Sequence, residues 1–235
     1  MTEKKFIIEL EKKGITINSN QLEQFNLYFK TLVEYNKKVN LTNITNKKEV
    51  YLKHFYDSLT LLFYNEIHQA STICDVGSRA GFPSIPLKIV RPDLKITIID
   101  ALGKRIKFLN NLLNVLKLNK VTATHARAEE YAKVNRETFD IVTARAVARL
   151  NILSEFCIPL VKEKGIFIAM KGQSVQDEIQ QSENGIKILG ATLISDYKFD
   201  LPNDGGSRNI LIFKKKVKTP NKYPRNYSKI KSKPL

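Results

Sequence analysis

The chain of 235 residues is long enough to bury one sizeable core together with a small appendage. Hydrophobic residues make up 43% and charged residues 26%, and these proportions exclude wholesale disorder. The formal net charge of +16 indicates RNA, DNA or an anionic membrane surface as partner, unless it only reflects a lysine-rich proteome. Because no apolar run is long enough to span a bilayer and no signal-peptide core follows residues 1–5, we expect a soluble cytoplasmic protein. Among the possible polyanions we expect RNA as the partner and no membrane.

A helical pattern runs through the first part of the chain. Apolar residues recur at helical spacing from Phe6 onward, and Gly14 is placed to end the first helix. Residues 20–23 and 46–49 each fit a capping box ahead of a further apolar face. We therefore predict that residues 1–70 form a helical N-terminal layer packed on the domain that follows.

From residue 71 onward, apolar strand-like runs alternate with helical patterns. The strands are predicted at residues 73–76, 96–100, 121–125, 139–144 and 165–171, with helices at 104–118 and 150–162. Nearly continuous apolar strands are typical of a parallel sheet that is covered by helices on both faces. The turn Pro-Asn-Asp-Gly-Gly at 202–206 predicts an antiparallel pair of strands, 186–195 and 208–215. The sequence therefore predicts an α/β fold with a doubly wound, mostly parallel sheet over residues 71–216.

A basic tail, residues 217–235, follows the last predicted strand. Its composition predicts that nothing in it builds a core, which is typical of a solvated and disordered segment. The same composition also suits RNA, because its cations alternate with Tyr223 and Tyr227, which offer rings for bases. On that second interpretation, Lys222 and Arg225 are expected to contact RNA.

Residues 73–83 have the pattern of a strand, a tight turn and the start of a helix. Gly77 and Gly81 allow positive φ and the close approach of a ligand, to which the helix would offer unpaired N–H groups. Arg79 stands where nucleoside sites usually have a second close glycine. Asp100 ends the next strand, about twenty residues past the turn, where a carboxylate can accept hydrogen bonds from ribose hydroxyls. The pattern predicts a nucleoside cofactor.

The chemistry of the turn favours S-adenosylmethionine over a dinucleotide. Acidic Asp75, directly before the turn, would repel a pyrophosphate but suits a sulfonium with a free amino group. Glu129, after the third strand, is placed to reach an adenine ring, or it is a carboxylate stabilised at a helix N-terminus. Arg145 and Lys171, at the ends of the fourth and fifth strands, are expected to face the cleft. A structural ion pair for Arg145 and a simple strand end for Lys171 are the competing interpretations.

No side chain is predicted to act as a catalytic acid, base or nucleophile. Cys74 and Cys157 lie in apolar segments without metal-ligand spacing, so we expect two reduced core residues and no metal. A segment of the Asn-Pro-Pro-Tyr type, which would cradle an exocyclic amine, is absent from the sequence. Methyl transfer to a ring nitrogen with a free lone pair, such as guanine N7, needs only orientation and desolvation. Many small-molecule acceptors would fit equally well.

Several motifs together give the chain a specific resemblance that covers nearly its whole length. They lie at residues 35–42, 54–59, 75–83, 100–105, 127–129, 145–146, 171–172 and 219–225. In these motifs the chain resembles the bacterial 16S ribosomal RNA guanine-N7 methyltransferase G family, long called glucose-inhibited division protein B. The resemblance implies a Rossmann-like enzyme that methylates N7 of one guanine in the decoding region of 16S rRNA, with S-adenosylmethionine as donor. It also implies low-level streptomycin resistance when the enzyme is lost, and we expect a monomer acting on the small ribosomal subunit.

The resemblance also assigns site residues. It implies cofactor contacts at Gly77, Phe82, Ala128, Glu129 and Arg145, and a ribose site at Asp100. The chain departs from the family at Arg79, where glycine is usual; its Cβ would crowd the cofactor, or its side chain turns outward to RNA phosphates. Two alternatives therefore stay open: an RNA-binding ribosome assembly factor whose cofactor binding is weakened or lost because of Arg79, and a methyltransferase acting on a small molecule or protein.

Overall fold

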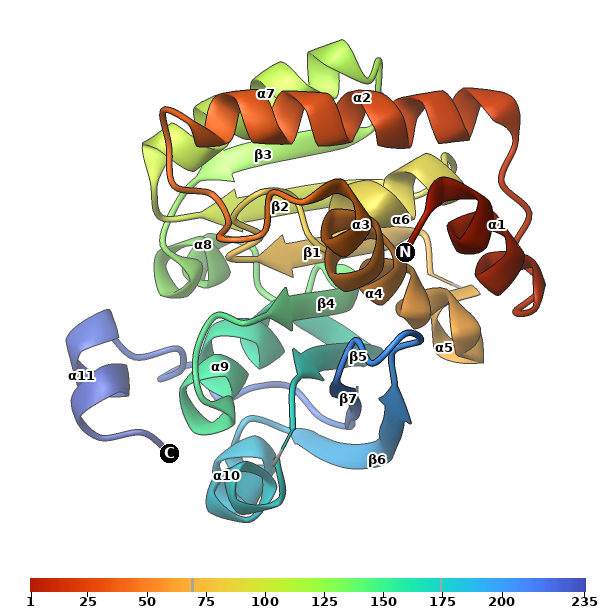
Figure 1. The fold of residues 1–235 in the computed structure, drawn as a ribbon. Coiled ribbons are helices and arrows are strands. Elements are labelled where there is room, and N and C mark those ends of the chain that lie inside the picture. The colour runs from red at the N-terminus through yellow and green to blue at the C-terminus, as the bar shows by residue number, and fades with distance from the viewer. Residues whose placement is uncertain (69, 174) are drawn as a thin grey trace.

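The computed structural model describes residues 1–68, 70–173 and 175–235. Within them, one sheet of seven strands has the order β3-β2-β1-β4-β5-β7-β6 (Figure 1). The strands are β1 (Thr72–Val76), β2 (Lys95–Asp100), β3 (Val121–His125), β4 (Phe139–Arg145), β5 (Val161–Lys171), β6 (Ala191–Asp200) and β7 (Ser207–Lys215). The first five strands are parallel, whereas β7 is antiparallel to both β5 and β6. The predicted α/β fold with a mostly parallel sheet is confirmed.

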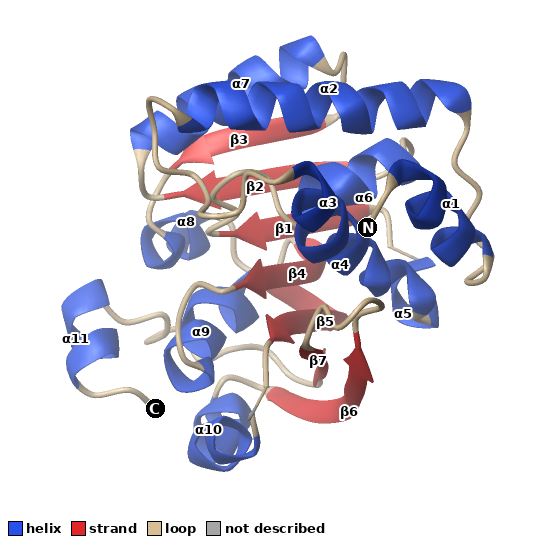
Figure 2. Cartoon of the chain, in the orientation of Figure 1, coloured by secondary structure: helices blue, strands red, loops and turns tan. Residues whose placement is uncertain are grey.

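Helices cover both faces of the sheet (Figure 2). The α-helices are α1 (Glu3–Glu11), α2 (Ser19–Asn36), α3 (Lys47–Val50), α4 (Asp57–Leu59), α5 (Asn65–His68), α6 (Ser84–Val90), α7 (Gly103–Val115), α8 (Ala128–Val134), α9 (Leu150–Cys157), α10 (Gln176–Ile188) and α11 (Tyr227–Ser232). Successive strand residues point to opposite faces, so Ile73 and Ile141 join one buried cluster, and Cys74 and Val142 join the other. Burial on both faces explains why these strands are nearly continuous in apolar residues.

The N-terminal helices pack on the sheet through aromatic side chains. Phe6 of α1 makes edge contacts with Phe25 of α2, at 5.1 Å between ring centroids, and with Tyr51, at 5.3 Å. All three rings are fully buried in the same cluster as Ile73 of β1. The division of the chain at residue 70 stays a prediction, but these contacts join the helices to the sheet through one shared core.

The starts of two N-terminal helices test the capping predictions. Asn46 caps α3, because its side chain accepts hydrogen bonds from the N–H groups of Lys48 and Glu49, but the Glu49 side chain does not complete the predicted box in the described structure. The box predicted at residues 20–23 is two residues too late. Asn18 caps α2 instead, accepting from the Gln21 N–H at 2.8 Å, while the Gln21 side chain accepts from the Asn18 N–H at 3.0 Å.

Several predicted elements have wrong boundaries, and two of them differ most. The helix predicted over 150–162 ends at Cys157 and continues as one short 3-10 turn, because β5 already begins at Val161. The strand predicted over 186–195 begins too early. Its first residues belong to α10, and Gly190, with φ of +90°, separates that helix from β6.

The prediction that nothing in the tail builds a core is wrong. Tyr223 and Ile230 are buried in the cluster that also contains the side chains of α9. Arg225 forms an ion pair with the fully buried Glu155 of α9, and Arg136 donates a hydrogen bond to the Tyr223 carbonyl. A few apolar and ion-pairing side chains therefore order a segment whose average composition is that of a solvated tail.

Cys74 and Cys157 are buried free thiols, as predicted. Burial raises the pKa of both thiols well above the ordinary value, so neither is a reactive thiolate. Within the described ranges, no helix is long and apolar enough to cross a membrane. The same residues contain no group of three or more His, Cys, Asp or Glu side chains that could hold a metal ion.

Candidate cofactor site

The turn after β1 is built around Gly77 and Arg79. Gly77 has φ of +73°, and a Cβ at this position would lie 2.8 Å from a methyl group of Val147. Glycine is therefore required here, but the space beside its Cα is filled by a side chain of the protein. Arg79 also lies in the left-handed region, with φ of +55°, and its N–H donates to Asp100 at 3.2 Å. The chain thus adopts at Arg79 the conformation that glycine would adopt more easily.

Asp75 lies beneath this turn and is fully buried. Its Oδ2 accepts a hydrogen bond from the Ser84 N–H at 3.3 Å, so the first N–H of α6 binds a carboxylate of the protein. That N–H is not free for a ligand, contrary to the expectation of unpaired groups at this helix start. Burial raises the pKa of Asp75 to about 7, and its Oδ1 has no hydrogen-bond partner among the residues described.

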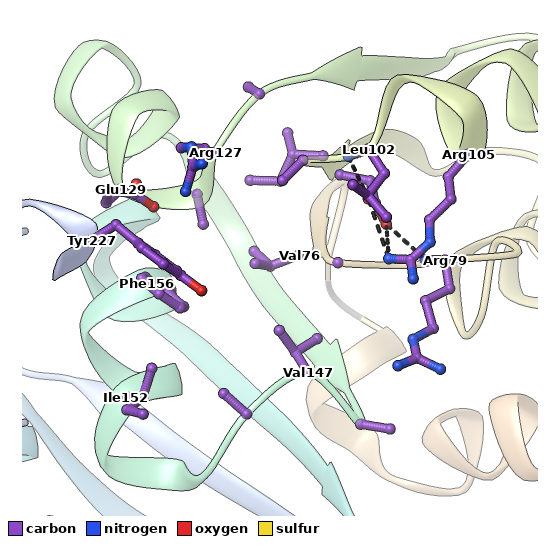
Figure 3. A pocket seen from close by; sticks show the side chains of 18 of the residues that line it. Val76, Arg79, Leu102, Arg105, Arg127, Glu129, Val147, Ile152, Phe156 and Tyr227 are labelled. Carbon is purple, nitrogen blue, oxygen red and sulfur yellow. Dashed lines mark hydrogen bonds and ion pairs between the residues drawn. The ribbon is translucent and has the colours of Figure 1, made fainter. Parts of the chain in front are cut away.

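A cavity of about 580 Å³ opens beyond the carboxyl ends of β1 to β4 (Figure 3). The residues that line it include Val76, Gly77, Arg79, Asp100, Leu102, Arg105, Arg127, Ala128, Glu129, Val147, Ile152, Phe156 and Tyr227. Ligands of open α/β sheets bind at this edge, where the strand order reverses between β1 and β4. The cavity therefore lies where the sequence predicts the nucleoside cofactor.

Asp100 is fixed at the tip of β2 by three donors. Its Oδ1 accepts from the Leu102 N–H at 2.9 Å, and its Oδ2 accepts from the Arg79 N–H. Arg105, in the first turn of α7, brings Nη1 to 3.2 Å from the same Oδ2. Arg105 was not predicted as a site residue, although it lies five residues after the acid, where the first turn of a helix folds back over a strand end.

Ala128 and Glu129 form the wall of the cavity beyond β3. Glu129 is only 3% exposed, yet within the described part of the chain its carboxylate has no ion pair or hydrogen bond. It lies in the first turn of α8, beside Arg127 and Tyr227 in Figure 3. Glu129 is therefore a helix N-terminal carboxylate that also lines the cavity, and its contact with an adenine ring stays a prediction.

Phe82 and Arg145 lie outside this cavity. Phe82 stacks on His54, with ring centroids 4.4 Å apart, and the Arg145 guanidinium lies 5.9 Å from the Phe82 ring. Arg145 forms an ion pair of 2.9 Å with Asp57, which is buried, as the competing interpretation anticipated. The structure thus groups Gly77, Asp100, Ala128 and Glu129 around the large cavity and places Phe82 and Arg145 to one side of it.

A second cavity of about 240 Å³ adjoins the first, and Ala146 lines both. Arg145 and Lys171 line it, together with Asp57, which also accepts from Arg208 at 3.1 Å. Lys171 donates to Glu178 at 2.7 Å and to a backbone carbonyl. Its ammonium group is therefore held by the protein itself.

The cations predicted to contact RNA differ in whether they already bind a carboxylate of the protein. Lys222 is exposed and lies over the Tyr223 ring, at 5.4 Å from the centroid. Arg225 is bound to Glu155, with its Nη2 at 2.6 Å from Oε2. Arg79 lines the cavity, and in the part of the chain that the structure describes its guanidinium forms no ion pair (Figure 3).

The strand order, with helices on both faces of the sheet, is the Rossmann-like α/β fold that S-adenosylmethionine-dependent methyltransferases have. A precorrin-6Y C5,15-methyltransferase from Geobacter metallireducens shares the fold, with a TM-score of 0.53 and 15% identity over 69% of this chain and 88% of that chain. A 16S rRNA (adenine(1408)-N(1))-methyltransferase from Catenulisporales acidiphilia gives a TM-score of 0.52 and 11% identity, over 64% of this chain and 87% of that chain.

Sequence comparison gives the particular family. The family model described as rRNA small subunit methyltransferase G, GidB, matches residues 21–201. A protein named ribosomal RNA small subunit methyltransferase G from Staphylococcus haemolyticus is 55% identical over 218 residues, which are 92% of this chain and 91% of that protein. The protein of the same name from Bacillus cereus strain B4264 is 56% identical over the same shares. The chain therefore belongs to the rRNA small subunit methyltransferase G family.

Proposed function

We propose that the protein transfers the methyl group of S-adenosylmethionine to N7 of one guanine in the decoding region of 16S rRNA. The observation that carries this proposal is the cavity at the strand ends, with Asp100 held at its rim and Glu129 unpaired in its wall. Relatives that are more than half identical to this chain are named as ribosomal RNA small subunit methyltransferases. We also propose that the protein acts as a cytoplasmic monomer on the small ribosomal subunit.

The residues around the cavity fit an adenosyl cofactor. Asp100 lines the cavity, and because its two oxygens already accept from Leu102, Arg79 and Arg105, a ribose hydroxyl would share or displace one of these contacts. Ala128 and Glu129 offer a backbone N–H and a carboxylate for the polar edge of an adenine base. Arg145 contacts the same cofactor only if the cofactor extends past Ala146 into the smaller cavity, whereas Phe82 lines neither cavity.

The acceptor chemistry needs little from the protein beyond position. When bound, S-adenosylmethionine supplies an electrophilic methyl group, and guanine N7 carries a lone pair that needs no deprotonation. His54, beside Phe82, stays neutral because burial lowers its pKa to about 3, and the raised pKa values of both cysteines exclude a thiolate nucleophile at neutral pH. The protein would therefore act by orienting both reactants and excluding water from their path.

RNA is proposed to approach the rim of the cavity at which Arg79 lies. Arg79 and Lys222 have no ion-pair partner among the described residues, so both cations can bind phosphates without breaking an ion pair of the protein. Lys171 and Arg225 already bind carboxylates of the protein. Their proposed contacts with RNA would add to those ion pairs or replace them.

A titration with S-adenosylhomocysteine separates this proposal from that of an RNA-binding assembly factor. We expect one molecule to bind per chain in isothermal calorimetry, because the cavity and the Asp100 site are already formed. The absence of a binding signal, combined with salt-dependent binding to small subunits, would favour the assembly factor.

A further inference from the structure

The C-terminal segment is fixed on α9 by several independent contacts. Arg225 donates through its backbone N–H and its guanidinium to Glu155, at 2.8 Å and 2.6 Å. Asn226 then caps α11 by accepting from the Lys229 N–H at 3.0 Å. Ile230 of α11 is fully buried. These contacts hold the first residue of the helix, Tyr227, at a defined place.

That place is the wall of the large cavity. The Tyr227 ring lies parallel to the ring of Phe156, at 6.2 Å between centroids and 4° between planes. The Arg127 guanidinium lies 5.0 Å from the same ring. Figure 3 shows the Tyr227 hydroxyl reaching into the cavity, and in the described part of the chain no hydrogen bond is made to it. An aromatic side chain that is 41% exposed therefore faces space within the site.

The position of this ring indicates the part of the cofactor that it meets. Arg105 and Arg79 lie at one end of the cavity, and Tyr227 lies at the other, next to Glu129 (Figure 3). Asp100 lies at the first end, because it is bound to both arginines. If Asp100 holds the ribose and the wall beyond β3 meets the base, the end occupied by Tyr227 is the adenine end.

We infer that the C-terminal segment completes the cofactor cavity and that Tyr227 contacts the adenine base of S-adenosylmethionine. This inference rests on the proposed function. The ring offers a flat apolar surface to a purine, and the hydroxyl can bond a ring nitrogen or the exocyclic amine. In this inference Tyr227 binds the cofactor, whereas the sequence pattern predicted that its ring contacts RNA bases.

Calorimetric titrations with two ligands test the inference. The ligands are S-adenosylhomocysteine and 5′-methylthioadenosine, which keeps the adenine and ribose but lacks the amino-acid part. Tyr227→Ala and Tyr227→Leu should each lower the affinity for both ligands by a similar factor of about ten, which is the usual effect of losing an aromatic contact with a base. Lys229→Ala is the matched control, because Lys229 is an exposed residue of the same helix that does not line the cavity. It should bind like the wild type.

The outcomes are distinct. If the wild type binds neither ligand, the proposed function itself fails. If the wild type binds and both Tyr227 variants bind equally well, only the inference about Tyr227 is overturned. Tyr227→Leu keeps an apolar side chain against Phe156. If this variant binds both ligands normally while Tyr227→Ala binds them weakly, Tyr227 only packs against the protein, and the inference is also overturned. Thermal unfolding with unchanged midpoints establishes that each variant is folded.

Fluorescence gives an independent measurement, because the chain contains no tryptophan. Tyr227→Trp places one reporter at the cavity, and Lys229→Trp places one on the same helix outside it. Saturating S-adenosylhomocysteine should quench the first reporter and leave the second unchanged. Equal responses in both variants, or a response of Tyr227→Trp to single-stranded RNA but not to S-adenosylhomocysteine, would contradict a contact with adenine.

Discussion

Asp100 shows how a single side chain at a strand end is prepared for a ligand. Two backbone N–H groups and the Arg105 guanidinium fix its carboxylate before any ligand binds. A ribose would therefore meet an acceptor whose rotamer is already fixed, and the loss of side-chain entropy on binding would be small.

Replacement of Asp100 by alanine should weaken the binding of S-adenosylhomocysteine by about 1–3 kcal/mol, because the ribose hydroxyls lose a charged acceptor. Calorimetric titration measures the effect. Asp93→Ala is the control, since Asp93 is an exposed carboxylate that is bound to Arg91 just before β2. Equal affinity in the Asp100 variant and the control would reject the ribose role.

The backbone of Arg79 has a positive φ of 55°, which glycine adopts more easily than arginine. Because its N–H already bonds Asp100 and its guanidinium lies at the rim of the cavity, Arg79→Gly should leave the affinity for S-adenosylhomocysteine unchanged. The same change should weaken RNA binding and reduce its salt dependence by about one unit of slope. A large gain in cofactor affinity would show instead that the arginine crowds the site.

Asp75 makes the stability of the cofactor-free protein depend on pH. Its folded pKa of about 7 is raised above the unfolded value, so the folded state binds more protons between about pH 4 and 7. Stability that is present at low pH is therefore lost as the pH rises through 7. His54 acts in the opposite direction, because its pKa is lowered to about 3 and its contribution is lost as the pH falls below about 6.5.

Comparison with Asp75→Asn isolates the first of these effects. Asparagine can still accept from the Ser84 N–H but carries no charge, so this variant should gain stability relative to the wild type between pH 5 and pH 8. The gain should be on the order of 2.7 kcal/mol, because only the two pH units from 5 to 7 contribute, at about 1.4 kcal/mol each, and it is measured by urea denaturation at both pH values. A difference between the two proteins that stays constant with pH would contradict a buried, titrating Asp75.

At the scale of elements, the tail and the sheet differ in what sequence could predict. Nearly continuous apolar strands with helices between them predict a parallel sheet, because each strand carries its own signal of burial. The ordering of the tail depends on pairs far apart in the chain. Arg225 meets Glu155, and Arg136 meets Tyr223, across 70 and 87 positions. Local composition contains no record of such pairs.

The same reason limits the prediction of the site. The residues of the large cavity lie next to recognisable strand ends, so Gly77, Asp100 and Glu129 could be found from pattern and spacing. The partner of Arg145, which is Asp57, comes from the N-terminal helices. Tyr227 reaches the cavity only because the tail folds back on α9.

Arg225→Ala tests the anchoring of the tail. It leaves the fully buried carboxylate of Glu155 without its cation, so the free energy of unfolding should fall by about 3–5 kcal/mol. Lys222→Ala, in the same segment but exposed, should change it by less than about 0.5 kcal/mol. If Arg225→Ala and the wild type have the same free energy of unfolding in urea denaturation, the tail is not anchored by this ion pair.

At the scale of the whole molecule, a net charge of +16 accompanies one preformed cavity of nucleoside size at the carboxyl ends of the parallel strands. In the proposed function, the cavity would hold the cofactor and the charge would attract the RNA. Neither feature alone separates a ribosomal RNA methyltransferase from an RNA-binding protein that has lost its cofactor. Membership of the family and the fixed carboxylate at the strand tip favour the enzyme.

The most direct test is methyl transfer itself. Purified protein is incubated with tritiated S-adenosylmethionine and, in separate reactions, with free 16S rRNA, small-subunit assembly intermediates and mature small subunits that lack the modification. Labelled RNA is then cleaved at N7-methylguanine and mapped by primer extension. We predict label at N7 of a single guanine in the decoding region in at least one of the three substrates. Label at another atom or base, or no label in any of the three, would contradict the proposed function.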